Sequence, residues 1–163
     1  STITRWISVE EPMKLLRALC GLTVILLLTV VSHAQTRPNF TGHWVQISPD
    51  EGAGSEEFIK HDATTLATAH DSEGGGHSVT YKLDGSEQRT TLGSHGSEIV
   101  TISRVTWQGN TLVISASTTY PDGRKMTGND TWSIDAEGHL VIDLDRTLAG
   151  QPIRMKLVHR KVQ

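Results

Sequence analysis

Histidine is the residue type in this chain that could take part in the most kinds of chemistry, metal binding above all. All but one of the eight histidines follow residue 34. Histidine is a common metal ligand, but a metal site needs clustered ligands, such as two histidines at i and i+2 on one strand face or a His-x-x-x-His on a helix. Neither spacing occurs. His61, His70 and His77 could converge at one rim of a sheet, yet we expect solvent-exposed loop histidines, no metal site and no other cofactor.

The chain shows no convergent set of catalytic residues. Residues 93–97 read Gly-Ser-His-Gly-Ser, but they form a turn rather than the Gly-x-Ser-x-Gly elbow of a strand–turn–helix. Asp143 and Asp145 share one strand face and could be paired carboxylates for acid–base catalysis. Because that face is opposite the apolar positions between residues 140 and 144, a solvated outer wall is the better interpretation. We therefore expect no catalytic residues and a protein that is not an enzyme.

Asp130 has a different setting. Alternation over residues 124–134 places it on the inward face with Gly128 and Trp132. A buried carboxylate is costly unless it is paired, so we expect either an inward-pointing Arg or Tyr partner or a polar contact to a ligand. The candidate ligand-binding residues are thus Trp107, Asp130 and Trp132. The alternative, which we favour for the indoles, is that Trp44, Trp107 and Trp132 fill the interior as core.

Short runs rich in Val, Ile, Thr and aromatic residues, separated by glycine-containing turns, carry these side chains. This pattern predicts an all-β chain: a single antiparallel up-and-down meander of about 8–10 strands that closes into a barrel or flattened barrel. Residues 48–55 leave no room for a helical lid. The expected strands are 42–47, 56–61, 64–70, 77–83, 88–93, 98–107, 111–120, 124–134, 139–146 and 152–161.

The first part of the chain has the pattern of a secretory leader. Met13 is followed by basic residues and then by an apolar run too short to span a membrane, and small residues precede Gln35. We expect an upstream segment at 1–12, a signal peptide at 13–34 and one domain at 35–163, located in the periplasm or outside the cell. The single cysteine, Cys20, falls inside the leader, so no disulfide is expected in the domain.

Charge narrows the set of partners. The formal net charge is −3 at pH 7. Mild acidity provides no electrostatic footprint for nucleic acid or for an anionic membrane. We expect a monomer or weakly associating protein, no stable membrane insertion after leader cleavage, and a small hydrophobic ligand as the partner.

Four motifs resemble exported bacterial lipocalin-like (calycin-type) β-barrel proteins of unknown function. Residues 39–45 read Asn-Phe-Thr-Gly-His-Trp-Val, residues 81–85 Tyr-Lys-Leu-Asp-Gly, residues 107–114 a Trp-x-Gly-Asn-x-Leu-x-Ile hairpin, and residues 129–134 end in Thr-Trp-Ser-Ile. The resemblance spans residues 38–161. It implies that Gly42 and Trp44 close the barrel and that a basic residue near the C-terminus, for which Arg160 is the candidate, caps the Trp.

Two functions follow as expectations. The first is that the barrel binds a small apolar or amphipathic molecule. The second is a non-catalytic envelope interaction or structural domain with a filled core, which acts through its outer surface. The motifs indicate the fold but do not distinguish between these two functions.

Overall fold

The computed structural model describes residues 36–71, 76–93 and 96–162, which belong to one compact unit, Gln35–Gln163. The predicted leader and the segment before it lie outside these residues. The described chain forms ten strands and no helix. The strands are β1 Gly42–Ser48, β2 Glu56–His61, β3 Thr65–Asp71, β4 His77–Lys82, β5 Glu87–Leu92, β6 Ile99–Gln108, β7 Thr111–Thr119, β8 Lys125–Ile134, β9 Leu140–Leu148 and β10 Gln151–Lys161.

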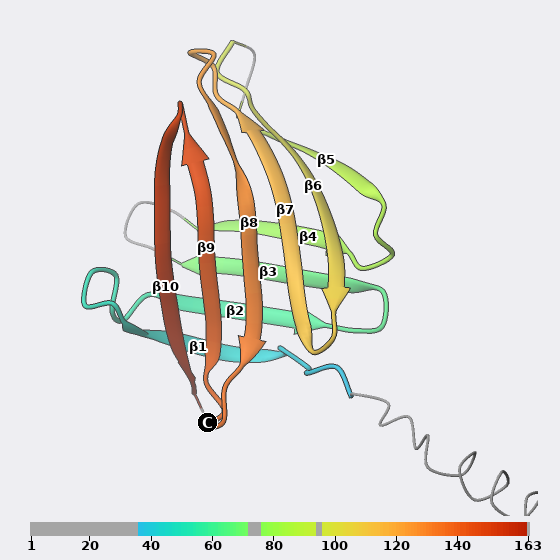
Figure 1. The fold of residues 1–163 in the computed structure, drawn as a ribbon, viewed down its shortest axis with the longest axis vertical. Helices are drawn as coiled ribbons and strands as arrows, with labels where there is room; N and C mark the ends of the chain where they lie inside the picture. Colours follow the sequence, from blue (N-terminus) through green and yellow to red (C-terminus); the bar gives the residue numbers. More distant parts are fainter. Residues whose placement is uncertain (1–35, 72–75, 94–95, 163) are drawn as a thin grey trace, which may run out of the picture. The chain divides into compact units, whose positions relative to one another are not determined.

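The ten strands make one antiparallel sheet in the order β4-β3-β2-β1-β10-β9-β8-β7-β6-β5. Strands that are adjacent in sequence pair as hairpins, apart from β4 and β5, which form the two edges of the sheet. The first strand, β1, also pairs with the last, β10. In Figure 1 strands β1–β4 run across the view behind the upright β7–β10. The predicted all-β meander is confirmed, and the sheet curls into a nearly closed barrel.

A side chain bridges the gap between the two edge strands. Gln88 of β5 accepts a hydrogen bond from the Lys82 backbone N–H of β4 at 3.1 Å, and its Nε2 donates to the Thr80 carbonyl. An amide side chain offers both a donor and an acceptor, so it can replace the pair of backbone hydrogen bonds that a neighbouring strand would make. Gln88 therefore satisfies backbone groups that an open sheet edge would leave unpaired.

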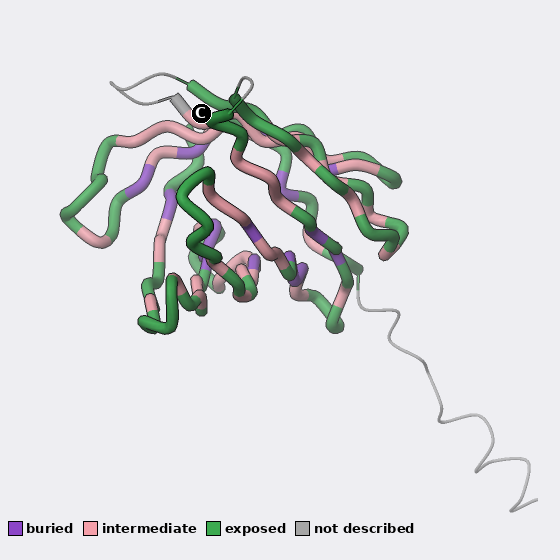
Figure 2. Tube along the Cα trace, turned by 90° about the horizontal axis from the view of Figure 1, so that it is seen from above, coloured by how far each residue is buried: buried purple, intermediate pink, exposed green. Residues whose placement is uncertain are grey.

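Side chains alternate between the interior and the solvent along the strands, and Figure 2 shows buried and exposed positions following one another along the chain. The register confirms the faces predicted for the C-terminal strands: Asp130 lies opposite Ile114 of β7 and Leu144 of β9. The interior is not uniform along the barrel, because one end is packed and the other is hollow.

Phe40, from the segment that precedes β1, packs the closed end. Its side chain is 0% exposed and stacks on Trp107 with ring centroids 6.0 Å apart. It also meets Trp132 edge-on at 5.9 Å. The Trp44 indole N–H donates to the Phe40 carbonyl at 2.9 Å. The buried residues around Phe40 thus form a floor, which consists of Phe40, Trp44, Ile59, Leu66, Val105, Leu112, Trp132, Leu140 and Ile142.

A cation lies over Trp44, as the barrel-closure motif implies, but it is Lys161 and not Arg160. The Lys161 Nζ is 5.3 Å from the centre of the Trp44 ring, and the two residues are opposite each other in the β1–β10 pairing. Arg160 is paired with Val45, one position along. Because successive strand residues face opposite ways, Arg160 points to the other side of the sheet. The prediction was displaced by one residue.

The connection from β1 to β2 is a turn-rich loop without a helix, as predicted from its length. Within the residues that the structure describes, no helix is long and apolar enough to cross a membrane.

Candidate functional site

A cavity of about 540 Å³ lies inside the barrel beyond the floor. It is walled by the length of β4, the first halves of β6 and β8, the ends of β5 and β7, and part of β9. Its volume falls in the range of roughly 300–1,000 Å³ that is usual for small-molecule sites. The cavity is therefore the candidate functional site.

The lining combines apolar side chains with hydroxyl groups. The apolar members are Val79, Leu92, Ile99, Ile114, Ala116 and Met126. The hydroxyl-bearing members are Tyr81, Thr90, Thr101, Ser103, Thr118, Tyr120 and Thr127. Two of the hydroxyls, Thr101 Oγ1 and Thr118 Oγ1, hydrogen-bond to each other at 3.0 Å across β6 and β7. Such a wall can hold an apolar body and orient a polar end.

Asp130 faces the cavity and is paired, as its predicted inward position required. The Arg146 Nε donates to Asp130 Oδ1 at 2.7 Å, and Arg146 Nη2 donates to Asp130 Oδ2 at 2.5 Å. The Asp130 side chain is 17% exposed and that of Arg146 is 32% exposed. Hydrogen bonding to Asp130 raises the pKa of Arg146. This bidentate geometry is the strongest form of a carboxylate–guanidinium pair.

Gly128 makes room for this ion pair. It is opposite Arg146 in the β8–β9 register. A Cβ at Gly128 would come within 2.5 Å of the Arg146 Cα and 3.0 Å of its Cγ. The missing side chain lets β8 and β9 approach closely and leaves space for Arg146 to extend toward Asp130.

Tyr81 belongs to the same electrostatic group. Burial raises the pKa of Tyr81, and the negative charge of Asp130 raises it further, while Arg146 partly opposes the shift. The phenol therefore stays protonated and can both donate and accept a hydrogen bond.

Further inward-facing polar residues lie on β2, β3 and β10. Glu57 accepts at its Oε2 from the His70 ring at 3.1 Å, and its side chain is 15% exposed. Burial raises the pKa of Glu57, although the hydrogen bond from His70 partly opposes the shift. On β10, burial lowers the pKa of His159, whose Nδ1 is enclosed without a hydrogen-bond partner. The interior of the barrel thus carries polar groups besides those that line the cavity.

Of the three predicted ligand-binding residues, the cavity lining includes Asp130 but neither Trp107 nor Trp132. Trp132 is 6% exposed and packs on Phe40. Trp107 stacks on Phe40 and also contacts the Arg37 guanidinium, whose Cζ is 5.0 Å from the Trp107 ring centre. Both indoles therefore belong to the packed end, which is the alternative interpretation that the sequence favoured.

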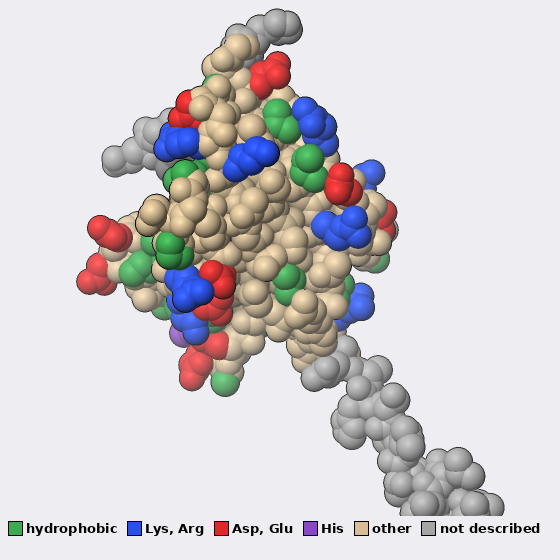
Figure 3. Space-filling view, turned by 45° about the horizontal axis from the view of Figure 1, so that its top comes forward, with side chains coloured by type: hydrophobic (Ala, Val, Ile, Leu, Met, Phe, Trp, Pro, Cys, Tyr) green, Lys and Arg blue, Asp and Glu red, His purple; other side chains and the backbone are tan. Residues whose placement is uncertain are grey.

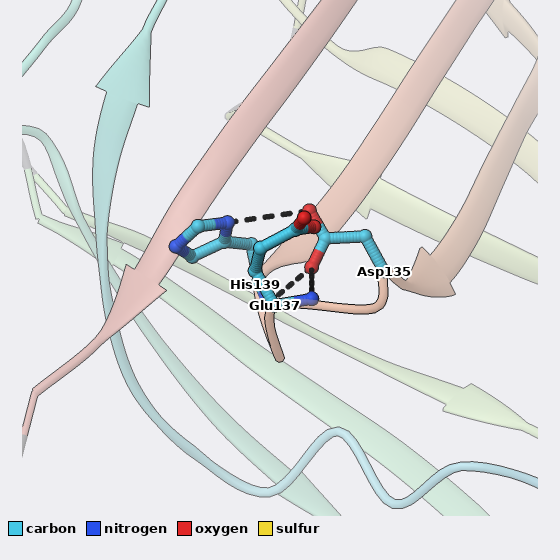
Figure 4. Close-up of side chains that lie close together, drawn as sticks. All are labelled: Asp135, Glu137 and His139. Carbon is cyan, nitrogen blue, oxygen red and sulfur yellow. Dashed lines mark hydrogen bonds and ion pairs between the residues drawn. The ribbon is translucent and has the colours of Figure 1, made fainter.

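The β8–β9 turn brings Asp135, Glu137 and His139 together, with ligand atoms within 4.8 Å of one another (Figure 4). The Asp135 carboxylate and the His139 ring already stabilise the turn. Asp135 Oδ1 accepts from the backbone N–H groups of Glu137 at 3.0 Å and His139 at 2.7 Å, and Oδ2 pairs with the His139 ring at 3.2 Å. These contacts account for the cluster as an Asx-type turn without an ion.

The outer wall carries paired charges. Asp143 lies 3.6 Å from Lys156, and Asp145 lies 3.2 Å from Arg154, all with exposed side chains. Figure 3 shows charged side chains of both signs spread over one face, with hydrophobic side chains only in small separate patches. The acidic pair Asp143 and Asp145 is therefore a solvated surface feature, as its strand parity indicated.

Arg146 and Tyr81 are site residues that sequence reasoning did not single out, and the edge-bridging Gln88 was not singled out either. Arg146 had a signal: the alternation that points Leu140, Ile142 and Leu144 inward reaches Arg146 two residues later. Nothing in the sequence linked Gln88 to β4, because that contact depends on where the two sheet edges meet.

No family model matches the chain, and no curated protein matches its sequence. Similar folds occur among solved structures. The REP1-NXSQ fatty acid transporter superposes with a TM-score of 0.56 at 13% identity, over 76% of this chain and 96% of that chain. A mutant of the fluorescent protein UnaG gives a TM-score of 0.49 at 19% identity, also over 76% of this chain and 96% of that chain. The chain therefore has the barrel fold of this fatty acid transporter.

Proposed function

We propose that this protein binds a small apolar or amphipathic molecule in the cavity of its barrel, without catalysing a reaction. The observation that carries the proposal is the cavity of about 540 Å³, which combines apolar walls with an ordered ion pair. The barrel fold supports it, because a structural relative is described as a fatty acid transporter.

A domain that acts only through its outer surface needs no such cavity. The packed floor around Phe40 and Trp132 would suit that alternative, yet it occupies one end of the barrel only. We therefore place the binding function first. The leader pattern of residues 13–34 supports the further proposal that the protein acts in the periplasm or outside the cell.

Fluorescence of Nile red, an uncharged apolar dye, tests the binding proposal. Ala116 of β7 lines the cavity, whereas its neighbour Ser115 is exposed on the outer face. We expect Ala116→Phe to weaken dye binding by about tenfold or more, because the ring takes up cavity space. Ser115→Phe should leave the affinity unchanged. Absence of dye binding, or equal effects of the two variants, would contradict the proposal.

The export proposal has a separate test. Expression of the full chain in a bacterial host, followed by fractionation and mass measurement, should give a shortened protein that begins at Gln35 outside the cytoplasm. Full-length protein retained in the cytoplasm would contradict it.

A further inference from the structure

The ion pair in the cavity bears on the class of ligand. Among the described residues that line the cavity, with histidine counted as neutral, Asp130 and Arg146 are those that carry a formal charge at neutral pH. Their charges cancel, and the bidentate contact uses both carboxylate oxygens and two of the three guanidinium nitrogens. The cavity therefore offers a neutral, hydrogen-bonding wall and no spare charge.

From this we propose that the cavity selects an uncharged amphiphile, one with an alcohol or amide head on an apolar chain, over amphiphiles with a carboxylate or an ammonium head. The inference rests on the proposed binding function and names the ligand class for the same site.

A carboxylate head is disfavoured in either of its two poses. If it replaces Asp130 on Arg146, Asp130 is left largely buried without a partner, which costs more than a surface charge would. If it binds beside the intact pair, two carboxylates lie close together and repel each other.

An ammonium head is disfavoured because it would leave Arg146 without its partner. It would have to draw Asp130 away from Arg146, and the guanidinium would then lose its partner in a site where only 32% of its side chain is exposed. Such an exchange replaces a bidentate pair by a single-point contact, which is a net loss.

An uncharged head has no such cost. Alcohol and amide groups both donate and accept hydrogen bonds, as do the Tyr81 phenol and the Thr101–Thr118 hydroxyl pair in the lining. The head can join these hydroxyls while Asp130 and Arg146 stay paired. The apolar chain then lies against residues such as Val79, Ile99 and Met126.

Displacement of Nile red by ligands with the same chain and different heads tests the inference. The probes are dodecanol, dodecanamide, dodecanoate and dodecylammonium, at a pH of about 8 where the carboxylate is ionised and histidine is neutral. We expect the two uncharged probes to bind about tenfold to a hundredfold more tightly than either charged probe. Dodecanoate or dodecylammonium binding as tightly as dodecanol would overturn the inference while leaving the binding function intact.

Asp130→Asn gives the reciprocal test. It frees Arg146, so we expect the affinity for dodecanoate, relative to that for dodecanol, to rise about tenfold or more. Asp143→Asn is the matched control, since it removes the same charge from the outer wall, and it should change neither affinity. An unchanged preference in a folded Asp130→Asn would also overturn the inference.

The outcomes separate the two proposals. If Asp130→Asn loses its cooperative unfolding transition, the ranking of the four probes on the unaltered protein decides alone. If neither Nile red nor any of the four probes binds, the binding function itself fails and this inference falls with it.

Discussion

Arg146 of β9 lies opposite Gly128 of β8, and the β9 backbone at Asp145 and Arg146, together with the Arg146 Cγ, occupies the space that a Cβ at Gly128 would need. From there the guanidinium reaches Asp130, two positions along β8, and holds both carboxylate oxygens. A glycine in the middle of a strand normally weakens the sheet. Here it permits the close strand contact on which the charged pair of the cavity depends.

Gly128→Ala should destabilise the barrel by roughly 1–3 kcal/mol, because the new Cβ would come within 2.3 Å of the Asp145 carbonyl oxygen and force β8 and β9 apart. Urea unfolding measures the loss. The neighbouring exposed Thr127→Ala should stay within about 0.5 kcal/mol of the unaltered protein. Equal stability of the two variants would show that the strands tolerate a side chain at Gly128.

Lys161→Gln should lower the free energy of unfolding by roughly 0.5–1 kcal/mol, since it removes the cation that lies over the Trp44 ring. Arg160→Gln serves as the control because Arg160 faces away from Trp44, and it should have almost no effect. A greater loss from Arg160→Gln, in the same denaturation experiment, would restore Arg160 to the capping role that the family resemblance implied.

The strands and their faces were predictable because alternation needs only local sequence. Asp130 could be placed inside from its neighbours Gly128 and Trp132, and the same alternation extended along β9 would have found Arg146. The capping residue could not be chosen, because the register between β1 and β10 is set by pairing of strands far apart in sequence.

The alternation of side chains along a strand also does not show which inward residues are packed in the core and which line a cavity. Trp107, Trp132 and Asp130 all point inward, yet Phe40 covers only the two indoles. Phe40 comes from the segment before the first strand, so its position depends on how that segment crosses the end of the barrel. This is why Trp132 is part of the floor and Trp107 packs against it, although both were also candidates for ligand contacts.

Acid should weaken the fold through two histidines. Burial lowers the pKa of His61 and of His159 below the usual 6.5. His61 Nδ1 also accepts the Phe40 backbone N–H at 3.2 Å, which requires an unprotonated Nδ1. The unfolded chain thus takes up protons first as the pH falls. The stability is fully present above a pH of about 6.5 and decreases toward the lower pKa values of the folded state.

Urea unfolding at a series of pH values between about 8 and 5 measures this loss. His61→Gln keeps an acceptor for Phe40 and removes a titrating group, so its stability should fall less steeply, as should that of His159→Gln. Glu57 acts in the opposite sense, because its raised pKa favours the folded state in acid, and it offsets part of the loss near the lower end of the series. Slopes identical to that of the unaltered protein in both variants would contradict this assignment.

Gln88→Ala should open the gap between β4 and β5. The Lys82 amide loses its acceptor and the Thr80 carbonyl loses its donor, at a cost of about 1 kcal/mol. Hydrogen exchange at Lys82 should become faster, while exchange in β8 and β9 should not change. Gln108→Ala, at an exposed position of β6, is the control. Unchanged protection of Lys82 in Gln88→Ala would mean that something other than Gln88 holds the two edges together.

The most direct test of the ligand cavity is a titration with dodecanol followed by backbone and indole N–H chemical shifts. If the cavity binds the ligand, the largest changes should fall on the cavity wall, at Thr101, Ala116 and Thr118, and the Trp107 indole, which stacks on Phe40 of the floor, should change little. Changes confined to the outer wall around Asp143 and Lys156, or centred on the Trp107 indole, would contradict it.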